Sequence, residues 1–445
     1  MTTTPDQQLD FLLTTALKMG ATAAEVILAS GSSTSVTIRN GTTERIERSD
    51  SQDVGLRVFI GQQVASASST DVRPDALKAL VERTVAMARV APEDPYAVMA
   101  TPAQLAKNAP DLDLNDPASL DAKALLALAT EAEDAARAVS GISNSDGADA
   151  SHSRSRVLLR GSNGLNYSAE HTDSGFSVCV LAGSGTGMER DYDYASAVYA
   201  GDLPPADAIG RNAGEQTVAR LNPRRVATGH YPVIFAPRVA ASLLRSFLSA
   251  INGSSIARGT SFLKDSLHKP VFGSSITIFE DPHRLRGQRS RPLDAEGLPT
   301  TAQKLIDGGI LQDWLLDLST AKRLGLQSNG HAVRGMASPP SPSASNVYLC
   351  ASTTALKDLL SLEMEAFYVT DLMGMGVNLI TGDYSQGASG FWLSKGERAY
   401  PVSEVTIAGK LQEMFMSLIP ADDLVFKTGI DSPTVLIPRM MVAGA

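Results

Sequence analysis

Six histidines are the residues best suited to bind a catalytic metal, and their spacing argues against a site on a single helix. Catalytic zinc usually takes three protein ligands, and a helical site places two histidines about one turn apart. No two histidines lie within ten positions of each other: they are His152, His171, His230, His268, His283 and His331. Each is therefore interpreted as a surface or hydrogen-bonded side chain. A Mg²⁺ or Mn²⁺ site built from carboxylates alone needs no fixed spacing and stays open.

Two glycine-rich segments resemble phosphate-binding loops but lack the residues that such loops need. Residues 182–187 (AGSGTG) precede a segment that reads as a strand. A dinucleotide loop would instead lead into a helix, whose N-terminus binds the pyrophosphate. Residues 382–387 (GDYSQG) have the glycine spacing of a P-loop, yet Ala388 and Ser389 stand where Lys and Ser or Thr are required. Both segments are interpreted as turns between strands.

Nucleophilic catalysis has no clear candidate. The G-x-S-x-G elbow of serine hydrolases is absent, because residues 387–390 (GASG) lack the second spacer. Cys179 and Cys350 both have apolar neighbours in the sequence, which favours buried, unreactive thiols.

Residues 237–250 form the element around which we expect the C-terminal half to be organised. Apolar residues recur there every three or four positions, and Pro237 suits a first helical turn, so the pattern predicts a helix with one buried stripe. Asn252 and Gly253 end it. Between residues 239 and 257 there is no Asp, Glu, His or Cys, and Arg245 carries the only charge. If a hydrolytic centre belongs on this helix, its chemistry is missing.

The remaining pattern predicts an α+β fold. The order of a helix, antiparallel strands and a second helix appears twice in the N-terminal part of the chain. Asn40-Gly41 is predicted as a hairpin turn within the first of these units, and a Pro- and Asp-rich connection at 91–121 separates the two units. The helices are expected at 5–19, 73–90, 121–139 and 205–221, and the strands at 25–28, 35–39, 43–48, 54–60, 64–67, 156–160, 165–170, 176–181 and 189–200. Short strands and Gly-rich turns follow. The predicted domains are an N-terminal α/β domain, residues 1–225, and a C-terminal β-rich domain, residues 226–445.

Composition restricts the class of protein. The chain has 445 residues, 43% of them hydrophobic, a net charge of −9 and a pI near 5.3. An acidic surface argues against a nucleic-acid partner. The first residues lack the basic and apolar regions of a leader, and no segment approaches 18 uninterrupted apolar residues, which argues against secretion and membrane spanning. With two cysteines far apart in the sequence, a reduced, cytoplasmic protein is expected.

Eight segments distributed over the whole chain resemble the TldD/PmbA family, also called TldD/TldE or modulator of DNA gyrase, and within it the PmbA/TldE branch. The segments are 53–57 (DVGLR), 258–262 (RGTSF), 294–300 (DAEGLPT), 307–311 (DGGIL), 321–325 (AKRLG), 381–392 (TGDYSQGASGFW), 402–409 (VSEVTIAG) and 432–437 (SPTVLI). The longest of them and the segment 402–409 are specific to the family.

The resemblance implies a metalloprotease in which the TldD partner carries the zinc. There the central helix has an H-E-x-x-x-H arrangement, and a Cys near the C-terminus is the third ligand. Counting back from residue 258, these helical positions fall near Leu244, Arg245 and Ser249, and no Cys follows Cys350. Leu has no lone pair, Ser is a poor zinc ligand, and Arg repels a cation and cannot serve as a general base. No metal or other cofactor is therefore expected in this chain.

The predicted function is that of a non-catalytic subunit of a cytoplasmic TldD/TldE-type complex that processes unfolded or modified peptides. Two alternatives stay open: a peptidase active by itself and a stand-alone peptide-binding module. Glycines permit close approach of another backbone, so a turn beside the central helix is predicted to accept an extended peptide. Its residues are Gly382, Asp383, Gly387, Ser389 and Gly390. Apolar residues in 372–379 and 435–442 predict a homodimer when the partner is absent.

Overall fold

The N-terminal half is built on one six-stranded antiparallel sheet with the strand order β3-β2-β1-β4-β5-β6. The computed structural model describes residues 4–444. The elements of this half are α1 (Pro5–Lys18), β1 (Ala23–Arg39), β2 (Thr42–Ile60), β3 (Gln63–Ser69), α2 (Pro74–Val90), α3 (Ala122–Arg137), β4 (Ile142–Gly161), β5 (Asn166–Ala182), β6 (Glu189–Ala197) and α4 (Ala206–Ala219). The predicted α+β class is confirmed, and so is the order of helix, strands and helix, twice over.

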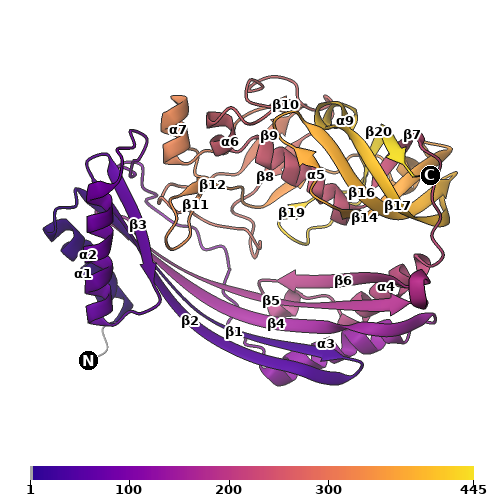
Figure 1. The fold of residues 1–445 in the computed structure, drawn as a ribbon, viewed down its shortest axis with the longest axis horizontal. Helices are drawn as coiled ribbons and strands as arrows, with labels where there is room; N and C mark the ends of the chain where they lie inside the picture. The colour runs from indigo at the N-terminus through magenta and orange to yellow at the C-terminus, as the bar shows by residue number, and fades with distance from the viewer. Residues whose placement is uncertain (1–3, 445) are drawn as a thin grey trace.

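Both helix pairs cover the same face of this sheet. Apolar residues of α1 and α2 pack with Val26, Leu28 and Leu56 over one end, and those of α3 and α4 pack with Val36 and Ile38 over the other. Since the β1 residues in these two sets all have even numbers, they point to one side of the sheet. The opposite side faces the C-terminal half, which lies above the sheet in Figure 1.

The strands at the centre of the sheet are longer than the sequence predicts. Residues 25–28 and 35–39 were expected as separate strands, but β1 runs unbroken for 17 residues. The polar stretch between them contains no apolar alternation that would indicate a strand. It stays extended because β2 and β4 pair with it on both sides, so neighbouring backbones rather than buried side chains hold it.

The C-terminal half contains a mixed seven-stranded sheet, with the main order β14-β7-β20-β17-β16-β15, and a five-stranded sheet, β10-β9-β8-β13-β19. Its strands are β7 (Gly229–Phe235), β8 (Ile278–Glu280), β9 (Gln303–Asp307), β10 (Ile310–Leu311), β11 (Ala332–Val333), β12 (Ser341–Pro342), β13 (Val347–Leu349), β14 (Glu365–Met373), β15 (Val377–Asn378), β16 (Asp383–Ser394), β17 (Glu397–Lys410), β18 (Ile419–Pro420), β19 (Ile430–Asp431) and β20 (Val435–Ala443). Its helices are α5 (Pro237–Ala250), α6 (Gly253–Ala257), α7 (Leu318–Leu324), α8 (Leu356–Ser361) and α9 (Leu411–Ser417). The domain boundary predicted between residues 225 and 226 falls in the connection from α4 to β7 and stays a prediction.

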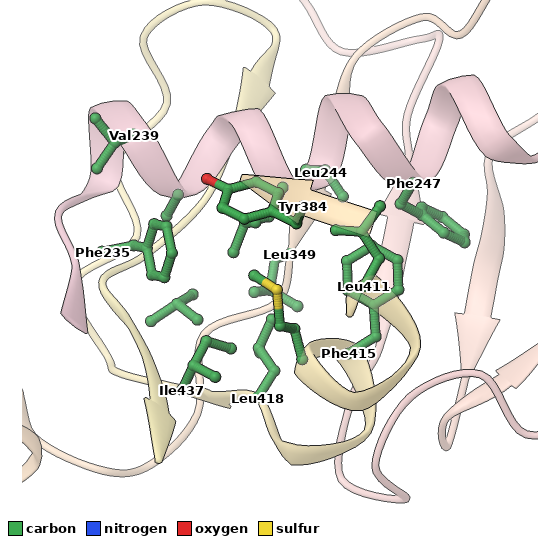
Figure 2. Packing of buried hydrophobic residues seen from close by; sticks show 14 of the residues in the cluster. Phe235, Val239, Leu244, Phe247, Leu349, Tyr384, Leu411, Phe415, Leu418 and Ile437 are labelled. Carbon is green, nitrogen blue, oxygen red and sulfur yellow. The ribbon is translucent and has the colours of Figure 1, made fainter. Parts of the chain in front are cut away.

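Helix α5 has the bounds that the periodicity predicts and lies on the largest hydrophobic core. Its apolar stripe packs on residues from both C-terminal sheets, as Figure 2 shows for Tyr384 of the seven-stranded sheet and Leu349 of the five-stranded sheet. Phe247 is fully buried, with its ring centroid 5.2 Å from that of Phe272 and 6.2 Å from that of Phe415. Among residues 4–444, no helix is long and apolar enough to cross a membrane.

Removing the Phe247 ring should destabilise the C-terminal half strongly. Phe247→Ala leaves a cavity between two aromatic neighbours, and such a change costs about 3–5 kcal/mol. The thermal unfolding midpoint, followed by circular dichroism, should fall by about 6 °C or more. Phe11→Ala is the matched control, because Phe11 lies on α1 with 38% of its surface exposed. A similar fall for both variants would contradict the central place of α5.

Candidate functional site

The face of α5 opposite its buried stripe carries polar side chains. Arg245 and Ser249 are exposed, whereas Leu244 is buried with 5% of its surface accessible. The three positions that the resemblance assigns to the H-E-x-x-x-H arrangement are thus a core leucine, an exposed arginine and an exposed serine. Ser249 donates its hydroxyl to the Arg245 carbonyl, a local bond within the helix.

Residues 237–245 of α5 form one wall of a cavity of about 580 Å³. The other walls come from β6 and α4 of the N-terminal half, from β14, from the start of β17 and from the segment that leads into β19. The lining residues include Tyr192, Asp193, Tyr194, Asn212, Arg238, Arg245, Tyr368, Thr370, Arg398, Asp423, Lys427 and Asp431. We take this cavity as the candidate functional site, because it lies against the polar face of α5 and its volume suits a small ligand or a peptide segment.

An ion-pair network joins the two halves of the molecule at one side of the cavity. Asp191 on β6 is 3% exposed and lies 2.9 Å from Nη2 of Arg238 on α5 and 3.2 Å from Nη1 of Arg220. Arg238 also donates to the Thr370 carbonyl, and Arg220 donates to the Ser389 hydroxyl at 2.8 Å. These bonds fix the beginning of α5 relative to β6, so the cavity has rigid walls on this side.

The segment that was predicted to be a peptide-binding turn is a strand in the structure, so the predicted turn is wrong. Asp383, Gly387, Ser389 and Gly390 lie within β16, and Gly382 directly precedes it. β16 is hydrogen-bonded to β17 on one side and to β14 and β15 on the other, so it offers no free edge for strand addition. A Cβ atom at position 390 would lie 2.0 Å from the Tyr368 carbonyl oxygen, so this glycine permits two strands to approach closely. Whether any of these residues contacts a peptide stays a prediction.

Ser389 is nevertheless connected to the candidate site. Its side chain is buried and accepts the hydrogen bond from Arg220. Asp383, by contrast, is exposed and pairs with Lys410 at the other end of β16. The sequence-predicted set therefore does not form one cluster, and one of its members contributes to the network that positions α5.

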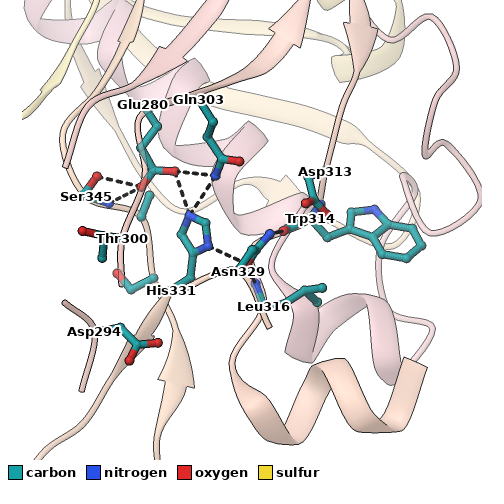
Figure 3. Close-up of polar contacts among 12 residues, drawn as sticks. Glu280, Asp294, Thr300, Gln303, Asp313, Trp314, Leu316, Asn329, His331 and Ser345 are labelled. Carbon is teal, nitrogen blue, oxygen red and sulfur yellow. Dashed lines mark hydrogen bonds and ion pairs between the residues drawn. The ribbon is translucent and has the colours of Figure 1, made fainter. Parts of the chain in front are cut away.

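A second polar cluster, centred on Glu280 in β8, is buried in the C-terminal half (Figure 3). One carboxylate oxygen of Glu280 accepts from the Ser345 amide at 2.6 Å and from its hydroxyl at 2.8 Å. The other lies 2.7 Å from Nε2 of His331 and accepts from Gln303 at 3.2 Å. His331 is thus a hydrogen-bonded histidine, as predicted. No sequence motif predicted this role of Glu280, because its hydrogen-bond partners are 23 to 65 residues away in the sequence.

The cluster around Glu280 has a structural role. The space that it encloses has no room for a water molecule, so no substrate reaches it. Burial raises the pKa of Glu280, but the hydrogen bond and charge of His331 and the two donors of Ser345 outweigh burial and lower the pKa to about 2. A carboxylate held in this way stabilises the folded protein while it is ionised.

Glu280→Gln should therefore destabilise the protein in a pH-dependent manner. The folded-state pKa of Glu280 lies below its ordinary value of 4.5, so the stabilisation is complete above about pH 5 and is lost as the pH falls toward 2. Near pH 7 we expect a loss of about 3–5 kcal/mol, because one partner of a buried pair is removed. The difference in thermal midpoint between wild type and variant should be constant from pH 7 to 5 and shrink below pH 4. Glu404→Gln, at an exposed ion pair with Arg225, is the control, and a difference independent of pH would contradict this role.

The residues of this chain do not fit a resident metal ion at α5. Among residues 4–444, no three His, Cys, Asp or Glu side chains come together in a way that could hold one. The six histidines are dispersed, and those with described side-chain bonds contact Ser174, Thr300 and Glu280 or its neighbours. Burial raises the pKa of both Cys179 and Cys350, which disfavours their metal-binding thiolate forms.

Models of three domains match the chain: PmbA/TldA metallopeptidase domain 1 at residues 24–88, the central domain at 115–221 and the C-terminal domain at 228–444. The sequence is 36% identical to the metalloprotease PmbA of Escherichia coli O157:H7 over 441 residues, which covers 98% of this chain and 96% of that protein. The chain therefore belongs to the PmbA/TldD metallopeptidase family, and the resemblance seen in the sequence is confirmed.

Solved structures show the same fold. A crystal structure of a putative modulator of DNA gyrase from Bacteroides thetaiotaomicron has a TM-score of 0.91 at 24% identity, and the match covers 99% of this chain and all of that one. TldE from Thermococcus kodakarensis has a TM-score of 0.86 at 18% identity, and the match covers 98% of this chain and all of that one.

Proposed function

We propose that this chain is a non-catalytic, PmbA/TldE-like subunit of a cytoplasmic TldD/TldE-type metalloprotease complex. The observation that supports the proposal is the polar face of α5. In a family named for metallopeptidases, this helix presents Arg245 to the cavity, exposes Ser249 and buries Leu244 in the core. None of these side chains is a usual zinc ligand, and none can activate water as a general base.

In this proposal the zinc and the hydrolytic chemistry belong to a TldD-type paralogue. This chain supplies a wall of the substrate cleft and helps admit extended or unfolded peptides. Its cavity has space for a peptide segment, and rigid ion pairs hold its walls. The peptide is expected to bind without cleavage when the partner is absent.

The test is a comparison of the purified chain, a TldD-type paralogue from the same genome and an equimolar mixture. The chain alone should contain no stoichiometric zinc by elemental analysis and should not cleave an unfolded polypeptide, because α5 offers no ligand set. The mixture should co-elute in size-exclusion chromatography and degrade the polypeptide. About one equivalent of zinc together with cleavage by the chain alone would favour a self-standing peptidase. Peptide binding without any association with the paralogue would favour a stand-alone peptide-binding module.

We also propose that the isolated chain forms a homodimer. Of the two apolar segments that predict it, residues 435–442 lie in β20, which is largely buried between β7 and β17. The other segment, residues 372–379 around β15, remains at the surface: Met373 and Met375 are 57% and 98% exposed, and the adjoining Ile380 is 61% exposed. Exposed apolar residues grouped in one segment are typical of a contact surface.

Met375→Asp should convert such a homodimer to monomers, because a charge in an apolar contact is desolvated without a partner. Light scattering at micromolar concentration measures the mass directly. Met87→Asp, on α2 and 43% exposed, is the matched control and should leave the dimer intact. A wild-type monomer, or a dimer that is unaffected by Met375→Asp, would contradict the proposed surface.

A further inference from the structure

The cavity beside α5 contains cationic side chains whose hydrogen-bond donors are not used. Arg245, Arg398 and Lys427 line it, and none of them forms an ion pair with any residue in 4–444. Arg398 stacks over the Phe391 ring at 4.3 Å, which leaves its N–H edge open. Arg245 and Lys427 are exposed. A guanidinium group has five N–H donors and no acceptor, so the donors of the exposed Arg245 are available to an acceptor on a ligand.

The acidic residues of the same cavity are occupied by neutral donors. Asp431 accepts from three backbone amides, those of residues 427, 428 and 429, at 2.9 to 3.1 Å. Asp423 accepts from the amide and the hydroxyl of Thr434, and Asp193 accepts from Asn212. These bonds hold the carboxylates in their own loops. The carboxylates of the cavity therefore have hydrogen-bond partners within the protein, whereas its three bases have no ion-pair partner among residues 4–444.

Two further features favour a negatively charged group at the same place. The N-cap of α5 is Ala236, which has no side chain to bind the first turn, and the N-terminus of a helix attracts anions. The hydroxyl of Thr370, which is 7% exposed and lines the cavity, has no hydrogen-bond partner within residues 4–444. A buried hydroxyl without a partner is costly unless a ligand or water completes its bonding.

The charge balance selects the kind of anion. Arg238 is neutralised by Asp191, and the three unpaired bases are matched in number by Asp193, Asp423 and Asp431. A polyanion such as a nucleic-acid backbone would therefore be repelled as much as attracted. A single carboxylate needs only local donors, and planar guanidinium groups bind it with two parallel hydrogen bonds. Beside these bases, Tyr192 and Tyr194, whose ring centroids are 6.3 Å apart, offer an aromatic wall for an apolar group.

We propose that this cavity binds the carboxylate of a peptide, either its C-terminus or an acidic side chain. Arg245 is the principal contact and Lys427 the second, with the peptide's remaining atoms against the two tyrosines. The inference rests on the proposed function for its peptide substrates and adds the chemical group that is recognised. Arg245, near the position of the TldD glutamate, would then hold an anion where the catalytic relative has an acid.

The test measures binding of short peptides to the full chain by fluorescence anisotropy with an N-terminal label. Three peptides of one neutral sequence are compared: a free C-terminal acid, the C-terminal amide, and the amide with one internal Glu. If the C-terminus is recognised, the free acid binds at least about tenfold more tightly than both amides. If a side chain is recognised, the Glu peptide regains that affinity. Equal affinities for all three peptides, or no saturable binding of either carboxylate up to about 1 mM, overturn the inference.

Variants locate the contact. Arg245→Gln should weaken binding of the favoured peptide by about tenfold or more and leave the affinity for the plain amide unchanged. Lys427→Gln should have a smaller effect in the same direction. Arg48→Gln is the matched control, because Arg48 is an exposed arginine on β2 that pairs with Asp50. All three side chains are exposed, so the thermal midpoints should stay near that of wild type. Unchanged binding by Arg245→Gln overturns the assignment.

The peptide-binding experiment can fail independently of the experiment that tests the proposed function. If the chain associates with its paralogue and the mixture degrades polypeptide, but the peptides are not distinguished, the inference alone fails. If carboxylate binding depends on Arg245 while no paralogue associates, the inference holds and the subunit role fails.

Discussion

The position of α5 depends on one buried carboxylate, that of Asp191. This group is removed from water and must be paired, and its partners are arginines from two other elements, α5 and the C-terminal end of α4. Removal of one partner of such a pair costs about 3–5 kcal/mol, because the remaining charge stays buried. Arg220 and Arg238 in turn bind β16 and β14. Asp191 therefore fixes β6 of the first sheet relative to α5 and, through the two arginines, relative to β14 and β16 of the seven-stranded sheet.

A second buried contact holds the far end of the first sheet. Arg334, from the segment after β11, lies 3.1 Å from Glu25 on β1, which also pairs with Arg57 on β2. All three side chains are nearly inaccessible. Next to them the backbone of Met336 lies so close to Gly55 that a Cβ atom there would be 1.9 Å from its carbonyl oxygen. Because the two halves are held at both ends of the first sheet, the cavity between them is a fixed feature.

The elements that could be predicted from the sequence are those whose pattern of buried side chains, or whose turn, lies within their own residues. The apolar stripe of 237–250 defines α5 within its own residues, and the hairpin turn at Asn40-Gly41 makes the first two strands neighbours. The long polar middle of β1 and the glycine-containing β16 were missed, because pairing with strands distant in sequence holds them extended. The cavity could not be predicted at all, since its walls come from residues between 192 and 432, brought together only by the tertiary fold.

The two faces of α5 are subject to different constraints, and this difference explains how the fold can keep its shape without a metal site. Its stability comes from the buried stripe, where Phe247 and its neighbours are fully enclosed. The exposed side chains of Arg245 and Ser249 contribute little to that core, so these two positions can change with small effects on folding. Helix α5 is held in place by Asp191 and by its core contacts, and neither depends on which residue occupies position 245. Under the proposals made above, this exposed face carries the base Arg245 where the resemblance places an acid in TldD, and its role would be to hold an anion instead of activating water.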